Sequence, residues 1–144
     1  LSGLSLAQRI KEPEGLIDPN TIERANLLLA RRKQHEPLQY ILGKTEFFGL
    51  QFSICHGVLI PRADTETLVE AAAAYLKKIG EKKNVRIGEI GIGSGIISLS
   101  LLNEFPSLEA SACDISQAAI NLSFENASMH KLDSRLELKL SDWQ

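Results

Sequence analysis

The sequence predicts an α/β fold built on an open parallel sheet, and three observations support this class. Three short apolar segments alternate with two segments of helical periodicity, which is typical of parallel strands joined by crossover helices. Glycines occupy every second position directly after the first apolar segment, in G-I-G-S-G at residues 91–95, as in a tight turn from a strand into a helix. The next two apolar segments each end in an acid, Asp114 and Asp142. Open α/β sheets commonly contain two such halves, so we expect this sheet to be incomplete, with the first three strands only.

Length and composition indicate an ordinary globular protein. The chain has 144 residues, of which 44% are hydrophobic and 24% are charged, enough for one core and an appendage. No segment is apolar over the length that a membrane span requires, and no signal peptide is recognisable. The chain begins at Leu1 rather than Met, which suggests trimming. A net charge of −2 predicts no general attraction for nucleic acid or membranes.

The cysteines and histidines do not predict a metal site. Cys55 and Cys113 are the two cysteines, and the three histidines show no ligand spacing with them or with one another. Two isolated thiols fit a reducing compartment, and Cys113 is expected to be a small buried side chain inside a strand. We therefore expect a cytoplasmic protein without a bound metal.

Residues 1–43 are expected to form a partial helical domain. Little structure is predicted before Asp18, beyond a short helix at Leu4–Ile10. A longer helix begins after Asp18, where Pro19 suits the first turn, and runs to about Lys33. This segment has the character of an appendage rather than of the main core.

The end of that helix carries a local basic run, Arg31 to Lys33. Cations near a helix C-terminus interact favourably with the helix dipole, so a structural role is favoured over nucleic-acid binding. Glu36-Pro37 interrupts the helical pattern, because the residue before proline is disfavoured in the α region. Leu38–Leu42 adds one further helical turn before Gly43.

Residues 44–60 are expected to form a β-hairpin linker. The period changes from helical to alternating in T-E-F-F-G-L-Q-F-S-I, Thr45 to Ile54, with Gly49 near the turn. The apolar side is predicted to consist of Phe48, Leu50, Phe52 and Ile54. A loop with a short extended piece follows and ends at Pro61-Arg62.

The strongest helix signal follows this loop. Asp64 is predicted to cap the helix, and Asp64 and Glu66 place negative charge at its N-terminus. Lys77, Lys78 and Gly80 favour its end near Ile79. The expected apolar stripe consists of Leu68, Ala72, Leu76 and Ile79.

The remainder of residues 61–144 is expected to alternate strands and helices. Val85–Ile90 is predicted to be a buried strand, and Pro106 marks the end of the helix that follows it. The other predicted elements are the helices Ile96–Asn103 and Gln117–Met129 and the strands Ala110–Cys113 and Leu136–Leu140.

The glycine turn predicts nucleotide binding, but not by a dehydrogenase. The dinucleotide fingerprint requires a third glycine one position later than Gly95, where Ile96 stands. Glu89 precedes the turn, and an acid in an otherwise buried strand is costly without a partner. We therefore favour a binding role for Glu89 over an ordinary surface position. The candidate turn residues are Gly91, Ile92, Gly93, Ser94 and Gly95.

Two acidic strand ends extend the candidate site. Asp114 is placed to accept hydrogen bonds from ribose hydroxyls, although it could equally cap the following helix. Asp142 could accept the amine of adenine while Trp143 packs against the base, and the alternative is a core tryptophan. Because the turn and both acids fall at the carboxyl ends of successive strands, we predict a crevice that binds a nucleoside.

Several segments resemble one protein family. The E-I-G-I-G-S-G turn, the C-D-I-S strand end and the L-S-D-W strand end resemble the first half of class I S-adenosylmethionine-dependent methyltransferases with a Rossmann-like sheet. The segments P-L-Q-Y-I-L-G, E-F-F-G-L and L-I-P-R-A-D-T-E-T-L-V-E are similar to the release factor glutamine methyltransferase (HemK) family. The resemblance covers Pro37 to Trp143. Its most specific part is I-P-R-A-D-T-E, in which Ala63 replaces a more rigid family residue.

The resemblance implies S-adenosylmethionine as cofactor and, as substrate, the glutamine side-chain amide in the Gly-Gly-Gln motif of peptide-chain release factors. It implies that residues 91–95 hold the methionine end, Asp114 the ribose, and Asp142 with Trp143 the adenine. Four more residues would border the pocket, namely Arg62, Asp64, Thr65 and Glu66, and the alternative for these four is helix capping together with a solvated arginine.

The family's Asn-Pro-Pro-Tyr motif, which holds the substrate amide, would follow Gln144. We therefore expect no catalytic residue within the chain, and no methylation by the chain alone. The alternatives are a methyltransferase acting on RNA or DNA bases and a non-catalytic nucleotide-binding module. A nucleic-acid enzyme should carry a broader basic surface than Arg31 to Lys33.

Overall fold

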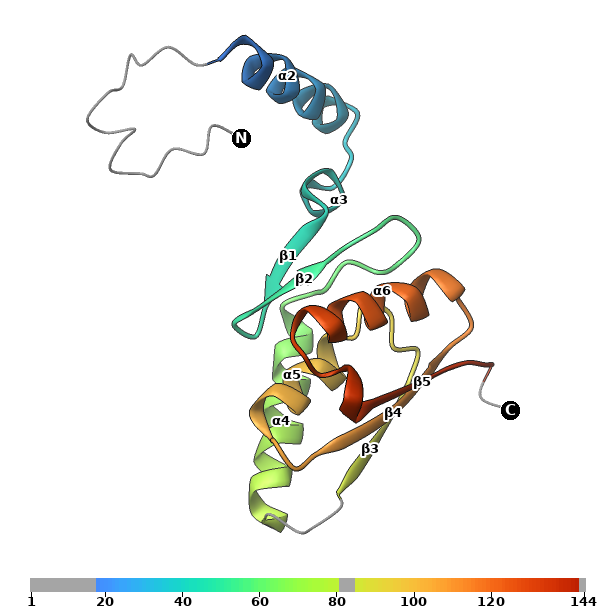
Figure 1. Ribbon diagram of the computed structural model, residues 1–144. Coiled ribbons are helices and arrows are strands. Elements are labelled where there is room, and N and C mark those ends of the chain that lie inside the picture. Colours follow the sequence, from blue (N-terminus) through green and yellow to red (C-terminus); the bar gives the residue numbers. More distant parts are fainter. Residues whose placement is uncertain (1–17, 81–84, 143–144) are drawn as a thin grey trace, which may run out of the picture. The chain divides into compact units, whose positions relative to one another are not determined.

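The computed structural model describes residues 18–80 and 85–142 (Figure 1). These residues belong to two compact units, one up to Ile41 and one from Leu42 onward. The expected helix at Leu4–Ile10 and the predicted adenine partner Trp143 lie outside the described residues.

The first unit contains the predicted N-terminal helix α2, Pro19–Lys33. Asp18 caps it, because its carboxylate accepts a hydrogen bond from Thr21 N at 3.2 Å. The three basic residues lie in the last turn, and Arg31 pairs with Glu36 at 2.5 Å. The predicted placement of these cations at the C-terminal end of the helix is therefore confirmed. The short helix α3, Leu38–Leu42, follows as predicted.

The hairpin opens the second unit. Strand β1, Lys44–Phe47, pairs antiparallel with β2, Leu50–Ser53, and Phe47 lies opposite Leu50. The turn residues Phe48 and Gly49 have φ of 49° and 74°, which fits a tight hairpin turn with two left-handed positions.

The predicted apolar side of the hairpin included Phe48 and omitted Phe47. The buried aromatic side chains are Phe47 and Phe52, 3% and 0% exposed, whose rings meet edge to face at 6.4 Å. Phe48 occupies the turn and is only partly buried, because the turn removes it from the alternation of the strand.

Helix α4, Asp64–Ile79, ends as predicted with Gly80 as its C-cap, but its N-cap and part of its buried face differ from the prediction. Asp64 is the first helical residue, and the capping position belongs to Ala63, which makes no side-chain cap bond. Val69, Ala73 and Leu76 are buried, whereas Leu68 is 55% exposed. Of the predicted stripe, Leu76 is buried and Ala72 and Ile79 pack against the core, so the prediction was wrong for Leu68 only. The prediction did not include Val69 and Ala73, and the four alanines after Glu70 reduce the contrast between the faces.

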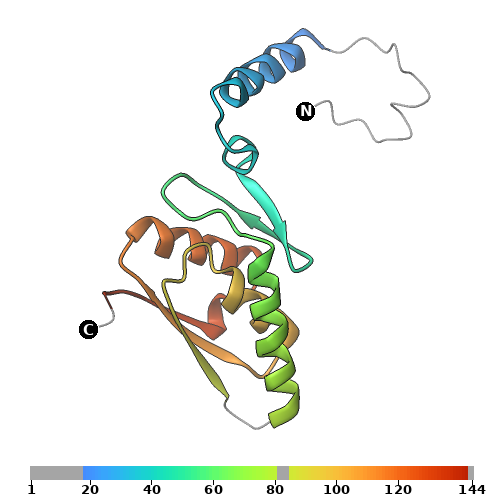
Figure 2. The same cartoon turned by 180° about the vertical axis from the view of Figure 1, so that it is seen from behind.

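The remaining elements alternate between strand and helix (Figures 1 and 2). They are β3, Arg86–Ile90; α5, Ile96–Glu104; β4, Glu109–Asp114; α6, Gln117–Met129; the 3-10 turn η1, Asp133–Arg135; and β5, Leu136–Leu140. The three strands form a parallel sheet in the order β3-β4-β5, which confirms the predicted fold class.

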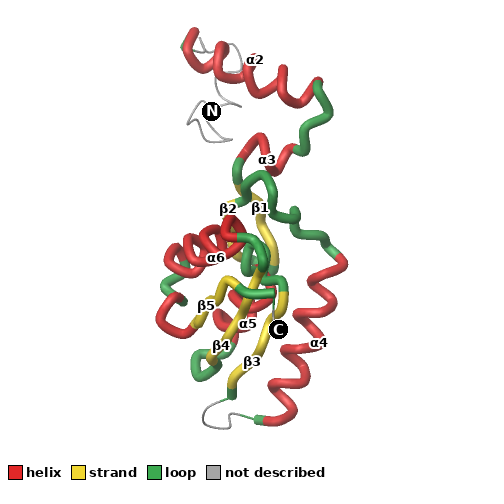
Figure 3. The backbone as a smooth tube through the Cα atoms, turned by 90° about the vertical axis from the view of Figure 1, so that its right-hand side faces the viewer, coloured by secondary structure: helices red, strands yellow, loops and turns green. Residues whose placement is uncertain are grey.

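The sheet is covered on one face only by described elements. Helices α5 and α6 pack on that face, and α4 lies beside α5 (Figure 3). Ala110 and Ala112 point into this core, while Ser111 and Cys113 alternate toward the other face and are half-buried. The prediction that β3 is a buried strand was therefore wrong for one face, as Ile90 is 63% exposed. The same geometry explains why Cys113 is not fully buried.

Candidate functional site

The glycine turn connects β3 to α5 in the conformation that its glycines permit. Gly91, Gly93 and Gly95 have φ of 75°, 57° and 84°, all in the region that other residues rarely adopt. Gly91 N and Ile92 N both donate to the carbonyl of Cys113, at 2.8 and 3.0 Å. The turn is thereby hydrogen-bonded to the carboxyl end of β4.

Gly95 is required for packing as well as for its dihedral angle. A Cβ atom at this position would lie 2.9 Å from Leu99 Cδ1 and 3.4 Å from Ser123 Cβ. Leu99 and Ser123 are both fully buried, so neither has room to withdraw. The missing side chain lets the start of α5 approach α6 closely.

Asp114 holds the turn from the end of β4. One carboxylate oxygen accepts from Gly93 N at 3.0 Å, and the other accepts from Ser116 N at 2.9 Å. The following helix is capped by Ser116, whose hydroxyl accepts from Ala119 N at 3.3 Å. Helix capping is thus not the role of Asp114. A carboxylate has about four acceptor sites, so two are left for a ligand.

Glu89 lies beneath the start of α5. Its carboxylate accepts hydrogen bonds from the backbone N–H of Ser98, at 3.1 Å, and from the Ser98 hydroxyl. Burial raises the pKa of Glu89 to about 7, the hydrogen bonds from Ser98 partly oppose this, and the charge of Asp114 adds to it. The acid in the strand therefore has a partner, and it sits close to the point of ionisation at neutral pH.

A cavity of about 320 Å³ opens beside the turn. It is lined by residues from the loop before α4, by Glu89, and by the turn with the first residues of α5. The loop contributes Leu59, Ile60, Pro61 and Arg62, and the first turn of α4 contributes Thr65. The glycine turn and the start of α5 contribute Gly91, Ile92, Gly93, Ser94, Ile96 and Ile97. The structure thus brings the I-P-R segment to the glycine turn.

The other two residues expected at the border lie elsewhere. Asp64 is exposed in the first turn of α4 and does not line this cavity. Glu66 accepts a hydrogen bond from Phe48 N at 3.2 Å, which links α4 to the hairpin turn. Glu66 therefore serves the packing of the hairpin.

The third strand end is only partly described. Ser141 N donates to the carbonyl of Asp114 at 3.0 Å, which joins the ends of β4 and β5. Asp142 follows and is exposed. The chain thus places Asp142 at the same edge of the sheet as Asp114.

Sequence reasoning missed Ser98, the partner of Glu89. Ser98 is fully buried within the apolar run I-I-S-L-S-L-L. A buried hydroxyl needs a hydrogen-bond partner, so a serine in an apolar helix nine residues after an acid in the preceding strand was a usable signal.

Within residues 18–80 and 85–142, no group of three or more His, Cys, Asp or Glu side chains is arranged to hold a metal ion. None of the helices in this part of the chain has the length and apolar character needed to cross a bilayer.

Comparison with models of protein families shows which family the chain belongs to. Residues 64–143 match the methyltransferase small domain, and residues 1–43 match the PrmC N-terminal domain. The chain belongs to the methyltransferase small domain family. S-adenosylmethionine is accordingly the cofactor of this methyltransferase domain.

Curated relatives carry a more specific name. The chain is 42% identical over 130 residues to a release factor glutamine methyltransferase from Fusobacterium nucleatum, covering 90% of the chain and 34% of that protein. It is 43% identical over 116 residues to one from Dictyoglomus turgidum, covering 81% of the chain and 40% of that protein. The chain thus spans well under half the length of these two relatives.

A solved structure of a methyltransferase from Geobacter sulfurreducens, in complex with S-adenosyl-L-homocysteine, also aligns with the chain. The alignment has 20% identity and a TM-score of 0.45, and it covers 58% of the chain and 30% of that structure.

Proposed function

We propose that this chain is the cofactor-binding part of an enzyme that methylates the glutamine side-chain amide in the Gly-Gly-Gln motif of peptide-chain release factors. The names of relatives with 42% and 43% identity support this substrate. The observation that carries the binding role is the glycine turn, which is bonded to Asp114 beside a cavity that contains Glu89. A cytoplasmic location, without membrane or direct nucleic-acid binding, is part of the proposal.

The residues of the site fit the parts of S-adenosylmethionine. We assign the turn, Gly91 to Gly95, to the methionine end, because a backbone without Cβ atoms permits close approach. Asp114 is assigned to the ribose hydroxyls, since its carboxylate keeps acceptor sites beyond its two present bonds. Asp142 and Trp143 are assigned to the adenine.

Glu89 would complement the positive charge of the cofactor. A cation placed in the cavity would favour the ionised carboxylate, whereas burial alone disfavours it. The Ser98 hydroxyl and N–H fix the carboxylate in one orientation, so little reorganisation is needed on binding. Arg62 and Thr65 lie across the same cavity and are proposed to border the bound cofactor.

When bound, the cofactor supplies an electrophilic methyl group on a sulfonium sulfur. An amide nitrogen is a weak nucleophile because its lone pair is delocalised, so positioning must supply much of the rate. The described residues account for binding and orienting the cofactor. We assign none of them to the substrate amide and expect this chain alone to show no methyl transfer.

The cofactor role is tested by calorimetry with S-adenosylhomocysteine on this chain. The Asp114→Ala substitution removes the ribose partner and the acceptor for Gly93 N, and we expect at least about a tenfold loss of affinity. Asp133→Ala, an exposed acid in η1, is the control and should bind as the unmodified chain does. Equal affinity of all three proteins would contradict the assignment of Asp114.

The substrate is tested on a longer form of the protein, at the length of its relatives. Methyl transfer to a release factor with an intact Gly-Gly-Gln motif is expected, and none to a variant with Gly-Gly-Asn. Mass spectrometry would locate the added methyl group. Methylation of RNA or DNA, with no transfer to the release factor, would refute the proposed substrate.

A further inference from the structure

The outer edge of the hairpin is closed by side chains of α6. In an antiparallel hairpin, only alternate residue pairs are hydrogen-bonded to each other. Ile54 N donates to Gly43 O at 2.9 Å, so Ile54 and Gly43 form one of the bonded pairs. It follows that the backbone groups of Gln51 and Ser53 point away from β1. The backbone N–H and C=O groups along such an open strand edge need hydrogen-bond partners. Figure 1 shows α6 beside β2.

Asn126 of α6 and His130, the C-cap residue that directly follows α6, satisfy this edge. The side-chain amide of Asn126 accepts from Ser53 N at 2.7 Å and donates to Ser53 O at 3.2 Å, as a neighbouring strand would. The His130 ring bonds to Gln51 O through Nε2 at 2.7 Å. Asn126 and His130 therefore both provide hydrogen-bond partners for the backbone of β2.

Asn126 differs from His130 in one further contact. Its side-chain nitrogen also donates to the carbonyl of Ser94 at 2.8 Å, inside the glycine turn. Both residues are buried, with Asn126 0% and Ser94 3% exposed, so water cannot replace this bond. Ser94 lies between Gly93 and Gly95, whose backbones have little steric restraint of their own.

We propose that Asn126 is a positioning residue for the cofactor site, which fixes the glycine turn through Ser94 and couples it to the hairpin. The proposal rests on the proposed cofactor role of the turn. The buried amide satisfies three backbone groups from two segments, so its loss leaves the Ser94 carbonyl without its donor. The turn then loses the bond that selects one of its accessible conformations.

The test compares Asn126→Asp with His130→Ala. The aspartate keeps an acceptor for Ser53 N but removes the donor to Ser94 O, whereas the alanine loosens the hairpin edge without touching the turn. Amide hydrogen exchange at Gly93 and Gly95 reports on the turn directly, because both N–H groups are bonded within the site. We expect exchange about tenfold faster in N126D and unchanged in H130A.

The affinity of S-adenosylhomocysteine is the second measurement, made well below the melting temperature of each variant. N126D should bind about tenfold more weakly, and H130A as tightly as the unmodified chain. If N126D fails to fold, N126S removes the same donor without adding charge and carries the same expectation.

Equal exchange at the turn in the Asn126 and His130 variants would overturn the proposal. Absence of binding by the unmodified chain would instead count against the cofactor role, and the exchange measurement would still decide the role of Asn126.

Discussion

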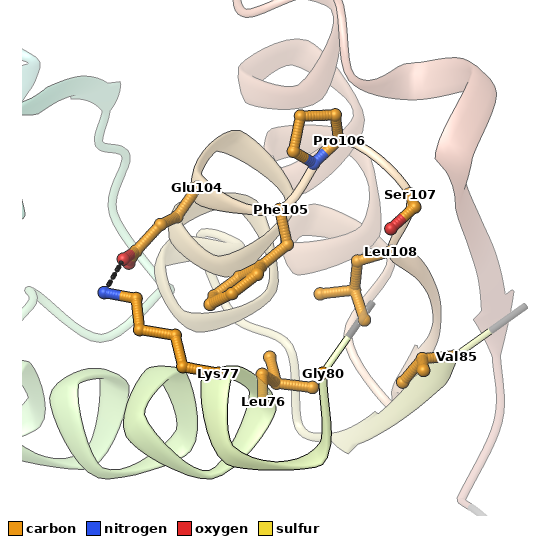
Figure 4. Close-up of a pocket in the computed structure, with 9 residues that line it drawn as sticks. All are labelled: Leu76, Lys77, Gly80, Val85, Glu104, Phe105, Pro106, Ser107 and Leu108. Carbon is orange, nitrogen blue, oxygen red and sulfur yellow. Dashed lines mark ion pairs between the residues drawn. The ribbon is translucent and has the colours of Figure 1, made fainter. Parts of the chain in front are cut away.

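Helix α5 has a cavity at each end, and the two cavities differ in their charges rather than in their size. The cavity at its N-terminus measures about 320 Å³ and contains Glu89, held by Ser98. The cavity at its C-terminus measures about 380 Å³ and is lined mainly by apolar side chains (Figure 4). There Glu104 pairs with Lys77 at 2.6 Å, with side chains 28% and 65% exposed.

The comparison shows which end of the helix is suited to chemistry. A buried carboxylate with a raised pKa responds to a bound cation, and the N-terminus of a helix adds a positive field. A solvent-exposed ion pair is screened and changes little when a ligand approaches. We therefore propose the cavity at the N-terminus of α5, rather than the one at its C-terminus, as the cofactor site.

The largest effect is expected from Gly95→Ala at the N-terminal end. The new Cβ would be strained at φ 84° and would meet Leu99, so we expect a loss of about 3–4 kcal/mol in unfolding free energy, with loss of cofactor binding. The matched change at the other end, Gly80→Ala, has φ 73° but no atom within 4 Å. Its φ of 73° and ψ of 173° lie in a region that is essentially restricted to glycine, so the substitution should cost about 1–3 kcal/mol and leave the affinity for S-adenosylhomocysteine unchanged. Denaturant unfolding and calorimetry would show whether the two ends differ in this way.

The next effect is a pH dependence that belongs to Glu89. Because its pKa is raised to about 7, the native state binds more protons than the unfolded state between pH 4.5 and 7. This contribution to stability is complete below the ordinary pKa and is lost as pH rises through 7, by at most about 3 kcal/mol. Glu89→Gln should flatten the stability profile over that range. Parallel profiles for the E89Q variant and the unmodified chain would mean that Glu89 titrates normally.

A smaller effect is expected from Arg135, which stabilises the C-terminal end of α5. Its guanidinium donates to the carbonyls of Leu102 at 2.8 Å, Phe105 at 3.0 Å and Leu108 at 3.0 Å. Arg135→Ala should reduce the unfolding free energy by about 2 kcal/mol, because these carbonyls lose a charged donor. Thermal unfolding measures this, and the affinity for S-adenosylhomocysteine should not change at a temperature where the variant is folded. A large loss of affinity would show that the two ends of α5 are not independent.

The smallest effect is expected from breaking the exposed ion pair in the larger cavity. Lys77→Ala should change the unfolding free energy by no more than about 0.5 kcal/mol, and less at high salt. The same denaturant titration at low and high ionic strength provides the measurement. A loss above about 1 kcal/mol would indicate that this pair is less well solvated than its exposure suggests.

Local sequence signals predicted the elements well where a single interaction decides them. Asp18 with Pro19 marked the start of α2, and the predicted bounds of α6 and β5 match those observed. The glycines at 91, 93 and 95 all adopt positive φ, as their spacing predicted. In these cases the dihedral preference or the side-chain cap acts within a few residues.

Burial was less predictable, because it depends on what packs against each element. On α4, Val69 is buried in the core, whereas Leu68 is exposed. In the hairpin, Phe47 is buried, whereas Phe48 is only partly buried. Strand β3 has the composition of a buried strand, yet Ile90 is exposed on the face that no described helix covers. Apolar composition is compatible with either outcome until the neighbours are known.

The sequence by itself determined the order of strands and helices, the glycine turn, and the acids at the ends of β3 and β4, since these follow from local conformation and chain order. Only the tertiary structure revealed Ser98 beneath Glu89 and Asn126 between Ser53 and Ser94. Asn126 and Ser53 are 73 residues apart in the chain, and no local preference of an asparagine in a helix indicates such a partner. The physical reason is that a buried polar group is satisfied by whatever backbone the fold brings to it, and that choice is made by packing.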